Sequence, residues 1–400
     1  MKLWQIAAVV IVFAVGLTWP AYAVVETGTP PKEASDGVEE KIVQEELSSD
    51  QVQEIERYLE QLDREVGGKL PPVTLRDWWD MVRGRRSFDW NALWQALVAY
   101  FWGAVVVNLR LLGQLVVLSA VAAVLANLQA AYEGETVGRT AWTVAYLVIL
   151  ALGIGGFRTA VGVSRGAITD LLSYMLSLLP LLAGLCVSAG AVTTAGILSP
   201  AMIVAVHTVS VLVADVVVPL MVFAVVLEVA SNLGEPARLT RLADLFRSLA
   251  TGTLGVLLAV FLGVTAVSGA AAAVSDGITV RTAKFLTGSF IPVVGKMFSD
   301  AVEVVVGTSL LVKSVVGLAG LFALVLTVAL PLIKLVVLIL VYKLAAALVQ
   351  PLGAGLVADT LASMGHGLVL VGLATAAVAL MFFLAAGIML GAGWLSVAFR

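Results

Sequence analysis

Ionisable side chains gather in one stretch of an otherwise apolar chain, "VSDGITVRTAKFLTGSFIPVVGKMFSDAVEVVV", which spans residues 274–306. The ionisable residues that we single out there are Arg281, Lys284, Lys296, Asp300 and Glu303. Lys296 and Asp300 are four residues apart, a spacing that places them side by side on a helix. Charge at membrane depth is tolerated only where it is buried in protein or faces water. The stretch is therefore either an amphipathic loop on the membrane surface or a hairpin that lines a vestibule or contacts a subunit.

The local signals in this stretch predict two short helices. Asp276 can cap a first helix that carries Arg281 and Lys284. Pro292 ends that helix and can serve as the first residue of a second one. We therefore expect a polar hairpin at 274–303 that runs into a membrane helix.

Further ionisable residues interrupt the apolar segments. They are Asp215, Glu228, Lys313, Lys334 and Lys343. Ionisable groups within membrane segments are rare, and they mark polar contacts or pathways. We take these five as candidate intramembrane polar residues.

The residue patterns that carry catalysis or metal binding are missing from the sequence. "GSFIPVVGKM" has the wrong spacing for a P-loop, and Met297 stands where Ser or Thr is needed. His207 and His366 stand alone, and the single cysteine, Cys186, allows neither a disulfide nor a cysteine metal site. We predict no catalytic residue, no metal, no cofactor and no enzymatic activity, so that energy coupling would need another subunit.

The composition is that of a polytopic membrane protein. Of 400 residues, 60% are hydrophobic and 13% are charged, whereas soluble domains are about a quarter charged. The first 23 residues, "MKLWQIAAVVIVFAVGLTWPAYA", have a basic start, an apolar core and an A-x-A site, as in a cleaved signal peptide. We predict an all-α polytopic membrane protein with a cleaved signal peptide and a small helical extracytoplasmic N-terminal region.

Two polar regions follow the signal peptide. Residues 24–73 are predicted as an acidic linker and an amphipathic helix that Gly67 and Gly68 terminate. The apolar stripe of this helix is Val52, Ile55, Leu59, Leu62 and Val66. The stripe packs either on the next segment or on another protein as a coiled coil. Residues 74–103, rich in Trp and Arg, are predicted to be interfacial helices lying on the bilayer.

Residues 104–400 are predicted to form a multispan membrane domain. The candidate segments are 104–128, 141–163, 171–190, 197–229, 249–268, 301–330, 335–350 and 367–393. Around Pro331 the pattern fits two spans with a tight turn or one long kinked helix. The cluster of Arg238, Arg241 and Arg247 suggests a cytoplasmic loop, and this agrees with an outside N-terminus if 197–229 is a re-entrant pair.

Several segments together resemble one family. They are "DGITVRTAKFLTGSFIPVVGKMFSDA", "KLAAALVQPLG", "LLPLLAGLCVSAGAVTTAGILSPAM" and "RLTRLADLFRSLATGTLGVLLAVFLG". They are similar to the stage III sporulation protein AE family of endospore-forming bacteria, over roughly residues 75–395. The resemblance implies a component of the mother-cell complex that joins a channel between mother cell and forespore and supports late spore development.

The resemblance also implies a location and partners. We expect a multi-pass protein of the mother-cell membrane around the forespore, acting as a scaffold or gate. Its expected partners are the lipid bilayer and other stage III sporulation membrane proteins, including a separate ATPase subunit, with no nucleic acid. The alternative is a stand-alone secondary transporter for a small solute, a class that often contains discontinuous helices.

Overall fold

Every described residue of the chain lies in a helix, a turn or a short irregular connection. The computed structural model describes residues 50–68, 70, 74–82, 85–131, 135–188, 191–233, 239–288 and 295–398. Within these ranges it leaves outside that description the side chains of 50, 51, 54, 82, 125–131, 135–139, 141, 233, 270–288, 295–311, 313 and 392–398. No strand occurs in these ranges, which confirms the all-α prediction. The predicted signal peptide, 1–23, and the linker that follows it lie outside the described residues and stay predictions.

Six helices in the described part of the chain are long and apolar enough to cross a membrane, judged by length and composition. The helices are α3 (Asp50–Val66), α4 (Leu75–Val82), α5 (Trp90–Ala131), α6 (Glu135–Ser188), α7 (Val192–Leu212), η1 (Val213–Val217), α8 (Val218–Leu233), α9 (Thr240–Gly288), α10 (Gly295–Val349), η2 (Gln350–Leu352) and α11 (Gly355–Ala398). The six candidate spans are α5, α6, the continuous α7–η1–α8, α9, α10 and α11.

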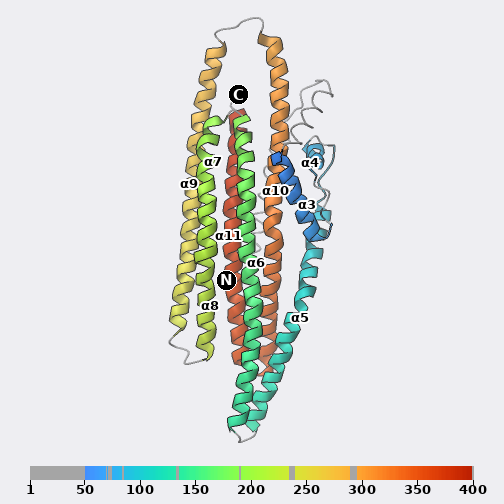
Figure 1. Cartoon of the computed structure of the whole chain (residues 1–400), viewed down its shortest axis with the longest axis vertical. Helices are drawn as coiled ribbons and strands as arrows, with labels where there is room; N and C mark the ends of the chain where they lie inside the picture. The colour runs from blue at the N-terminus through green and yellow to red at the C-terminus, as the bar shows by residue number, and fades with distance from the viewer. Residues whose placement is uncertain are drawn as a thin grey trace.

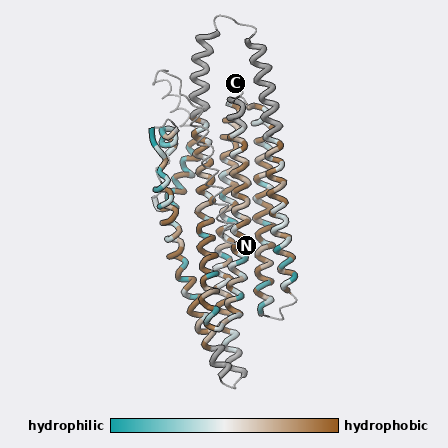
Figure 2. The backbone as a smooth tube through the Cα atoms, turned by 180° about the vertical axis from the view of Figure 1, so that it is seen from behind, coloured by the Kyte–Doolittle hydropathy of each residue, from teal (hydrophilic) through white to brown (hydrophobic). Residues whose placement is uncertain are grey.

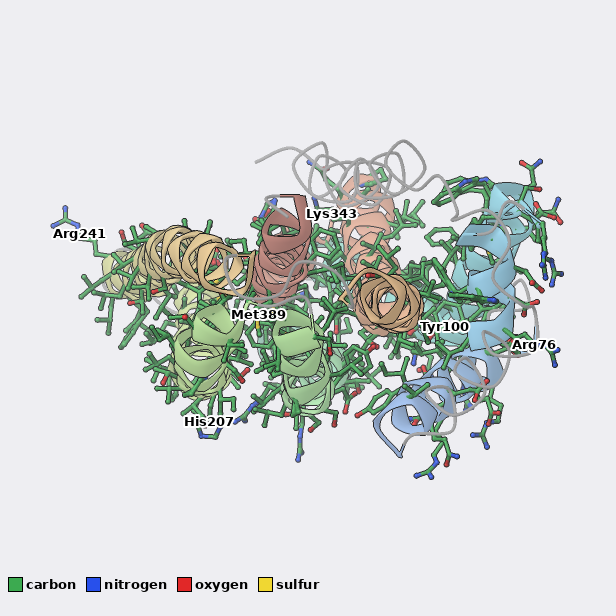
Figure 3. The ribbon with its side chains drawn as sticks, turned by 90° about the horizontal axis from the view of Figure 1, so that it is seen from above. Arg76, Tyr100, His207, Arg241, Lys343 and Met389 are labelled. Carbon is green, nitrogen blue, oxygen red and sulfur yellow. The ribbon has the colours of Figure 1, made fainter. Side chains whose placement is uncertain are left out.

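The long helices run side by side in one elongated bundle (Figure 1). Seen from above, α6 and α7 form one side, with α11 and α9 behind them, and α10 lies between α11 and the N-terminal helices (Figure 3). The tube in Figure 2 is apolar along most of each long helix and polar at α3 and α4. Buried residues such as Leu178, Leu182, Phe382 and Met389 fill the interior between α6, α10 and α11.

Helix α6 corrects the predicted division into segments 141–163 and 171–190, because it continues without a break from Glu135 to Ser188. The charged stretch around Arg165 and Asp170 remains helical. Ala167, Ile168 and Leu171 from this stretch all face the core, so that the helical period is kept while the polar side chains point outward. A charged interruption in the sequence therefore marks one face of the helix rather than a loop.

The segment 197–229 is a continuous helix, so the predicted re-entrant pair is wrong. Pro219 has no N–H to donate to the carbonyl four residues before it, that of Asp215. The chain responds with a π-turn over Val213–Val217, in which the N–H of Val218 donates to the carbonyl of Val213. This wider turn lets α7 continue into α8 past the proline.

Two predicted interruptions further along the chain are also helical. Helix α9 runs from Thr240 to Gly288, so Asp276 lies inside it and does not cap a short helix. Helix α10 passes through Pro331, which merges segments 301–330 and 335–350 and selects the single long helix from the two alternatives. Residues 289–294, which include Pro292, lie outside the described residues.

The chain itself buries the apolar stripe of α3. Val52, Ile55, Leu59, Leu62 and Val66 are each less than 10% exposed, and α3 packs chiefly on α10 and α6 rather than on the segment that follows it. Gly67 and Gly68 end the helix with φ of +80° and +69°, as predicted. The partner of the stripe is therefore a surface formed by helices more than 100 residues further along the sequence.

Candidate functional site

Asp215 is paired with a residue that the sequence analysis did not single out. Arg165 Nη2 of α6 lies 2.7 Å from Asp215 Oδ1 in η1. The two side chains are 50% and 56% exposed, so the pair lies on the outer surface of the bundle. Arg165 was missed because its stretch was assigned to a break between spans. Testing a helical period through 160–171 would have placed it on the outer face.

Glu228 forms the centre of a polar cluster that joins three helices. Its Oε2 pairs with Arg247 of α9, and its Oε1 accepts a hydrogen bond from Ser363 Oγ of α11 at 3.0 Å. Arg247 also lies 3.4 Å from Asp244, one turn earlier in α9. The Glu228 and Arg247 side chains are only 25% and 31% exposed, so this cluster is the better-buried counterpart of the Arg165–Asp215 pair.

A hydrogen-bonded chain lies one helical turn away from this cluster. Tyr146 Oη of α6 and Thr360 Oγ1 of α11 are 2.9 Å apart, and Asn232 Nδ2 of α8 donates to Thr360 Oγ1 at 3.5 Å. Thr360 and Ser363 are one turn apart on α11, while Asn232 and Glu228 are one turn apart on α8. Together the cluster and the chain tie α6, α8, α9 and α11 to one another.

Lys334 lies where the N-terminal helix α3 meets the bundle. Its Nζ lies 3.8 Å from Glu65 of α3 and 5.7 Å from the centre of the Tyr100 ring of α5, within the range of a cation–π contact. In Figure 3 Tyr100 lies beside α10, on the side that carries the N-terminal helices. The sequence predicted Lys334 as a polar residue in a membrane helix, whereas its partner from the acidic region was not predicted.

The other predicted site residues are not brought together with these clusters. Lys343 lies partly buried against α11, where a Cβ on Gly365 would meet its Cγ at 3.5 Å. The side chains of the hairpin residues and of one further lysine lie outside the described residues; these are Arg281, Lys284, Lys296, Asp300, Glu303 and Lys313. For these six, the sequence predictions stay untested.

Two buried tyrosines that the sequence analysis did not identify hold the helices at close range. The Tyr342 hydroxyl of α10 donates to the carbonyl of Gly153 in α6, and the Tyr174 hydroxyl of α6 donates to the carbonyl of Gly320 in α10 at 2.7 Å. A Cβ on Gly156 would lie 2.6 Å from the Tyr342 hydroxyl. The glycines in this part of α6 therefore allow close helix packing.

The chemistry of these clusters is that of ion pairing and hydrogen bonding between helices. Asp215 and Glu228 each pair with an arginine from a neighbouring helix. Within the described ranges no three His, Cys, Asp or Glu side chains are grouped as metal ligands. His207 points outward from α7 (Figure 3), and Cys186 is buried.

The fold and these clusters together define a class: a polytopic helical membrane protein whose long apolar helices are joined by polar contacts. The sequence model of the family Stage III sporulation protein AE matches residues 73–393. A relative, Stage III sporulation protein AE from Bacillus subtilis (strain 168), is 37% identical over 358 residues, which is 90% of this chain and 90% of the relative. The chain belongs to the stage III sporulation protein AE family. No solved structure matches it.

Proposed function

We propose that the chain is a non-enzymatic membrane component of the complex that forms a channel or secretion apparatus between mother cell and forespore. The observation that carries the proposal is membership of the stage III sporulation protein AE family over most of the chain. In this proposal the protein lies in the mother-cell membrane around the forespore and acts as a scaffold or gate during late spore development.

The scaffold role agrees with the way the polar residues are used. Glu228 joins α8 to α9 and α11, and Lys334 joins α10 to α3. Such contacts fix the relative positions of helices, which is what a structural subunit requires. Because the sequence lacks a P-loop, we propose that a separate ATPase subunit supplies energy and that other stage III sporulation membrane proteins are its partners.

The transporter alternative loses the feature that favoured it. Secondary transporters build their sites from discontinuous helices, and the two segments expected to be broken are continuous here. Helices α7 and α8 are joined through the π-turn, and α10 passes through Pro331. We therefore retain the channel-complex component as the one proposed function.

We further propose an orientation, which the course of the helices supports. Three long helices, α5, α6 and α7–α8, precede α9, and the last turn of α8 and the first turn of α9 lie at the end of the bundle away from α3 and α4 (Figure 1). Arg241 is the second residue of α9 and Arg247 is the eighth. An extracytoplasmic N-terminal region therefore places this basic end in the cytoplasm, in agreement with the positive-inside rule, without a re-entrant pair.

Deletion of the gene in the organism that encodes it tests the proposed function. We expect normal vegetative growth and an arrest of spore development after engulfment, because the proposed complex acts only at that stage. Microscopy with a membrane dye gives the stage of arrest, and heat-resistant spore counts give the yield. A deletion strain with normal spore counts would reject the proposal.

A further inference from the structure

The exposed face of α6 changes from apolar to polar at one point along the helix. From Val144 to Gly155 every exposed residue is apolar or a glycine, and Val144 and Ile154 are each about half exposed. From Arg158 to Ser173 every exposed residue is polar or a glycine. The change therefore falls between Gly155 and Arg158, within one turn of the helix.

A cavity of about 320 Å³ lies at this point, between α5 and α6. Leu338 of α10 forms part of its wall. Ala151, Gly155 and Thr159 of α6 also line it, and all three are exposed. The cavity therefore opens to the outside of the bundle, and we call it the α5–α6 groove.

The α5–α6 groove has one polar end. Helices α5 and α6 run in opposite directions (Figure 1), and a Cβ on Gly156 would lie 2.9 Å from Leu111 Cδ2. Asn108, one turn before Leu111, is therefore level with Thr159, and these two are the polar residues of the lining. From Thr159 the groove extends to Ala151, a distance of about 12 Å along the helix.

The polar end offers hydrogen-bond donors and a positive charge. Asn108 Nδ2 donates to the carbonyl of Ala104 at 2.8 Å, which uses one of the two N–H groups of that amide. The other N–H has no partner among the described residues. Arg158, the neighbour of Thr159, is exposed and forms no ion pair within the described part of the chain.

The ionisable residues of the three helices around the groove are all basic. Over residues 101–124, 142–164 and 335–352 they are Arg110, Arg158 and Lys343. The acidic residues of α3 stop short of this region, because α3 ends at Val66 and Glu65 pairs with Lys334, one turn of α10 before Leu338. The local field is therefore positive and attracts an anionic group.

The size and polarity of the groove indicate a lipid chain rather than a polypeptide. An α-helix is about 10 Å wide, so a 12 Å length of it would need roughly 900 Å³, almost three times the cavity. An extended peptide would need hydrogen-bond partners along its whole backbone, whereas the polar residues of the lining lie at one end. An acyl chain needs no such partners.

We propose that the α5–α6 groove binds one acyl chain of an anionic phospholipid. The phosphate lies near Arg158, an ester carbonyl accepts from Asn108, and the chain runs toward Ala151 and Leu338. The headgroup is then on the polar side of the change along α6, and the chain is on the apolar side. This ligand site goes beyond the proposed function and requires only that the chain lies in a membrane.

Photo-crosslinking of the full-length chain tests the site. The protein is reconstituted in nanodiscs of phosphatidylcholine and phosphatidylglycerol, with a trace of phosphatidylglycerol that carries a diazirine in its acyl chain. Mass spectrometry then locates the label. We expect more label on residues 108–111 and 151–159 than around Val256 and Val260, which α9 exposes outside any such groove. Equal labelling of the two regions would overturn the proposal.

A pair of matched variants tests whether the groove itself is occupied. Gly155 lines the groove and Gly162, two turns further along the same exposed face, does not. A Cβ on either glycine meets nothing within 4 Å, so both leucine variants should unfold at the same midpoint. Loss of two buried methylenes weakens binding about tenfold, so Gly155→Leu should lower the labelling by at least that factor and Gly162→Leu should leave it unchanged. Equal labelling in the two variants would overturn the proposal.

The headgroup is tested by removing one charge. A basic side chain near the membrane surface contributes about fivefold to the binding of an anionic lipid. Arg158→Gln should therefore lower the ratio of labelling by phosphatidylglycerol to labelling by phosphatidylcholine about fivefold. Arg241→Gln, which removes the same charge from the far end of α9, should leave that ratio unchanged. A ratio that stays the same in Arg158→Gln would overturn the anionic headgroup.

Labelling in membranes from sporulating cells distinguishes a lipid from a protein segment. We expect the groove to be labelled there as it is in nanodiscs. Labelling that is lost in the cell membranes would mean that a partner or a second copy fills the groove, and it would overturn the proposal. Each readout is a labelling yield, so a failure here is distinguishable from a failure of the proposed function, which spore counts test.

Discussion

Removal of Arg247 should destabilise the bundle by leaving a carboxylate with one of its two partners missing. Glu228 accepts from Arg247 of α9 and, through its other oxygen, from Ser363 of α11. Breaking a fully buried pair costs about 3–5 kcal/mol, while a surface pair is worth at most about 1 kcal/mol. With the two side chains 25% and 31% exposed, we expect Arg247→Met to cost about 2 kcal/mol of unfolding free energy, between these limits.

The matched control is the same substitution on the same helix. Arg241 lies six residues earlier in α9 and extends away from the bundle (Figure 3). Arg241→Met should therefore change the unfolding free energy by less than about 0.5 kcal/mol. Purified full-length protein in a mild detergent is unfolded with increasing denaturant, and the midpoint and slope give the free energy of each variant.

A double-mutant cycle isolates the pair itself. Glu228→Gln keeps the shape of the side chain and a group that can bond to Ser363. Combined with Arg247→Met, it should show a coupling energy of about 1–2 kcal/mol, since the two side chains are in direct contact. A coupling energy within the error of independent sites, about 0.3–0.5 kcal/mol, or equal losses from Arg241→Met and Arg247→Met, would refute this reasoning.

The remaining predictions concern packing, the N-terminal helix, the hairpin and processing. A Cβ on Gly367 would lie 2.0 Å from Val225 Cγ2, whereas one on Gly252 meets nothing within 4 Å. In the same unfolding assay, Gly367→Ala should therefore lower the unfolding free energy by about 1–3 kcal/mol, and Gly252→Ala should change it little. Equal effects of the two substitutions would contradict the α8–α11 packing. Leu59 of α3 is 3% exposed, whereas Gln61 is exposed. Leu59→Asp should therefore release α3 from the bundle and speed protease cleavage near Gly67–Gly68, while Gln61→Asp should not. Identical cleavage rates in the two variants would argue against packing of α3 on the bundle. If Lys296 and Asp300 form a buried pair, Lys296→Ala and Asp300→Ala should each lower the spore yield at unchanged protein level, and swapping the two charges should partly restore it. A normal spore yield in both single variants would instead favour the interpretation of this stretch as a surface loop. N-terminal sequencing of the membrane-bound protein should begin at Val24, and a start at Met1 in all molecules would reject cleavage.

The sequence alone predicted the helical class and several individual features correctly. The apolar stripe of α3 and its end at Gly67–Gly68 follow from spacing and from the φ freedom of glycine. Asp215, Glu228 and Lys334 were identified because ionisable residues in apolar segments need a partner, and each has one in the structure. These predictions succeeded because they depend on local patterns.

The errors arose where tertiary packing outweighs a local signal. The predicted gap at 164–170, which contains Arg165 and Asp170, is part of a continuous helix whose other face is buried. The segment that contains Pro219 was expected to be a re-entrant pair, although a π-turn keeps the chain helical there. Around Pro331 two spans or one long helix were both open, and the structure has the long helix. The partners Arg165, Arg247 and Glu65 could not be paired from the sequence, since they come from helices whose neighbours only the fold determines.

Purification from sporulating cells tests the central claim, that this chain is one component of a larger membrane complex, most directly. The full-length chain carries an affinity tag and is solubilised in a mild detergent, and mass spectrometry identifies the co-purifying proteins against an untagged strain. The account predicts that other stage III sporulation membrane proteins and an ATPase subunit are enriched with it. Recovery of the chain alone, together with solute uptake after reconstitution into vesicles, would contradict the account and favour a stand-alone transporter.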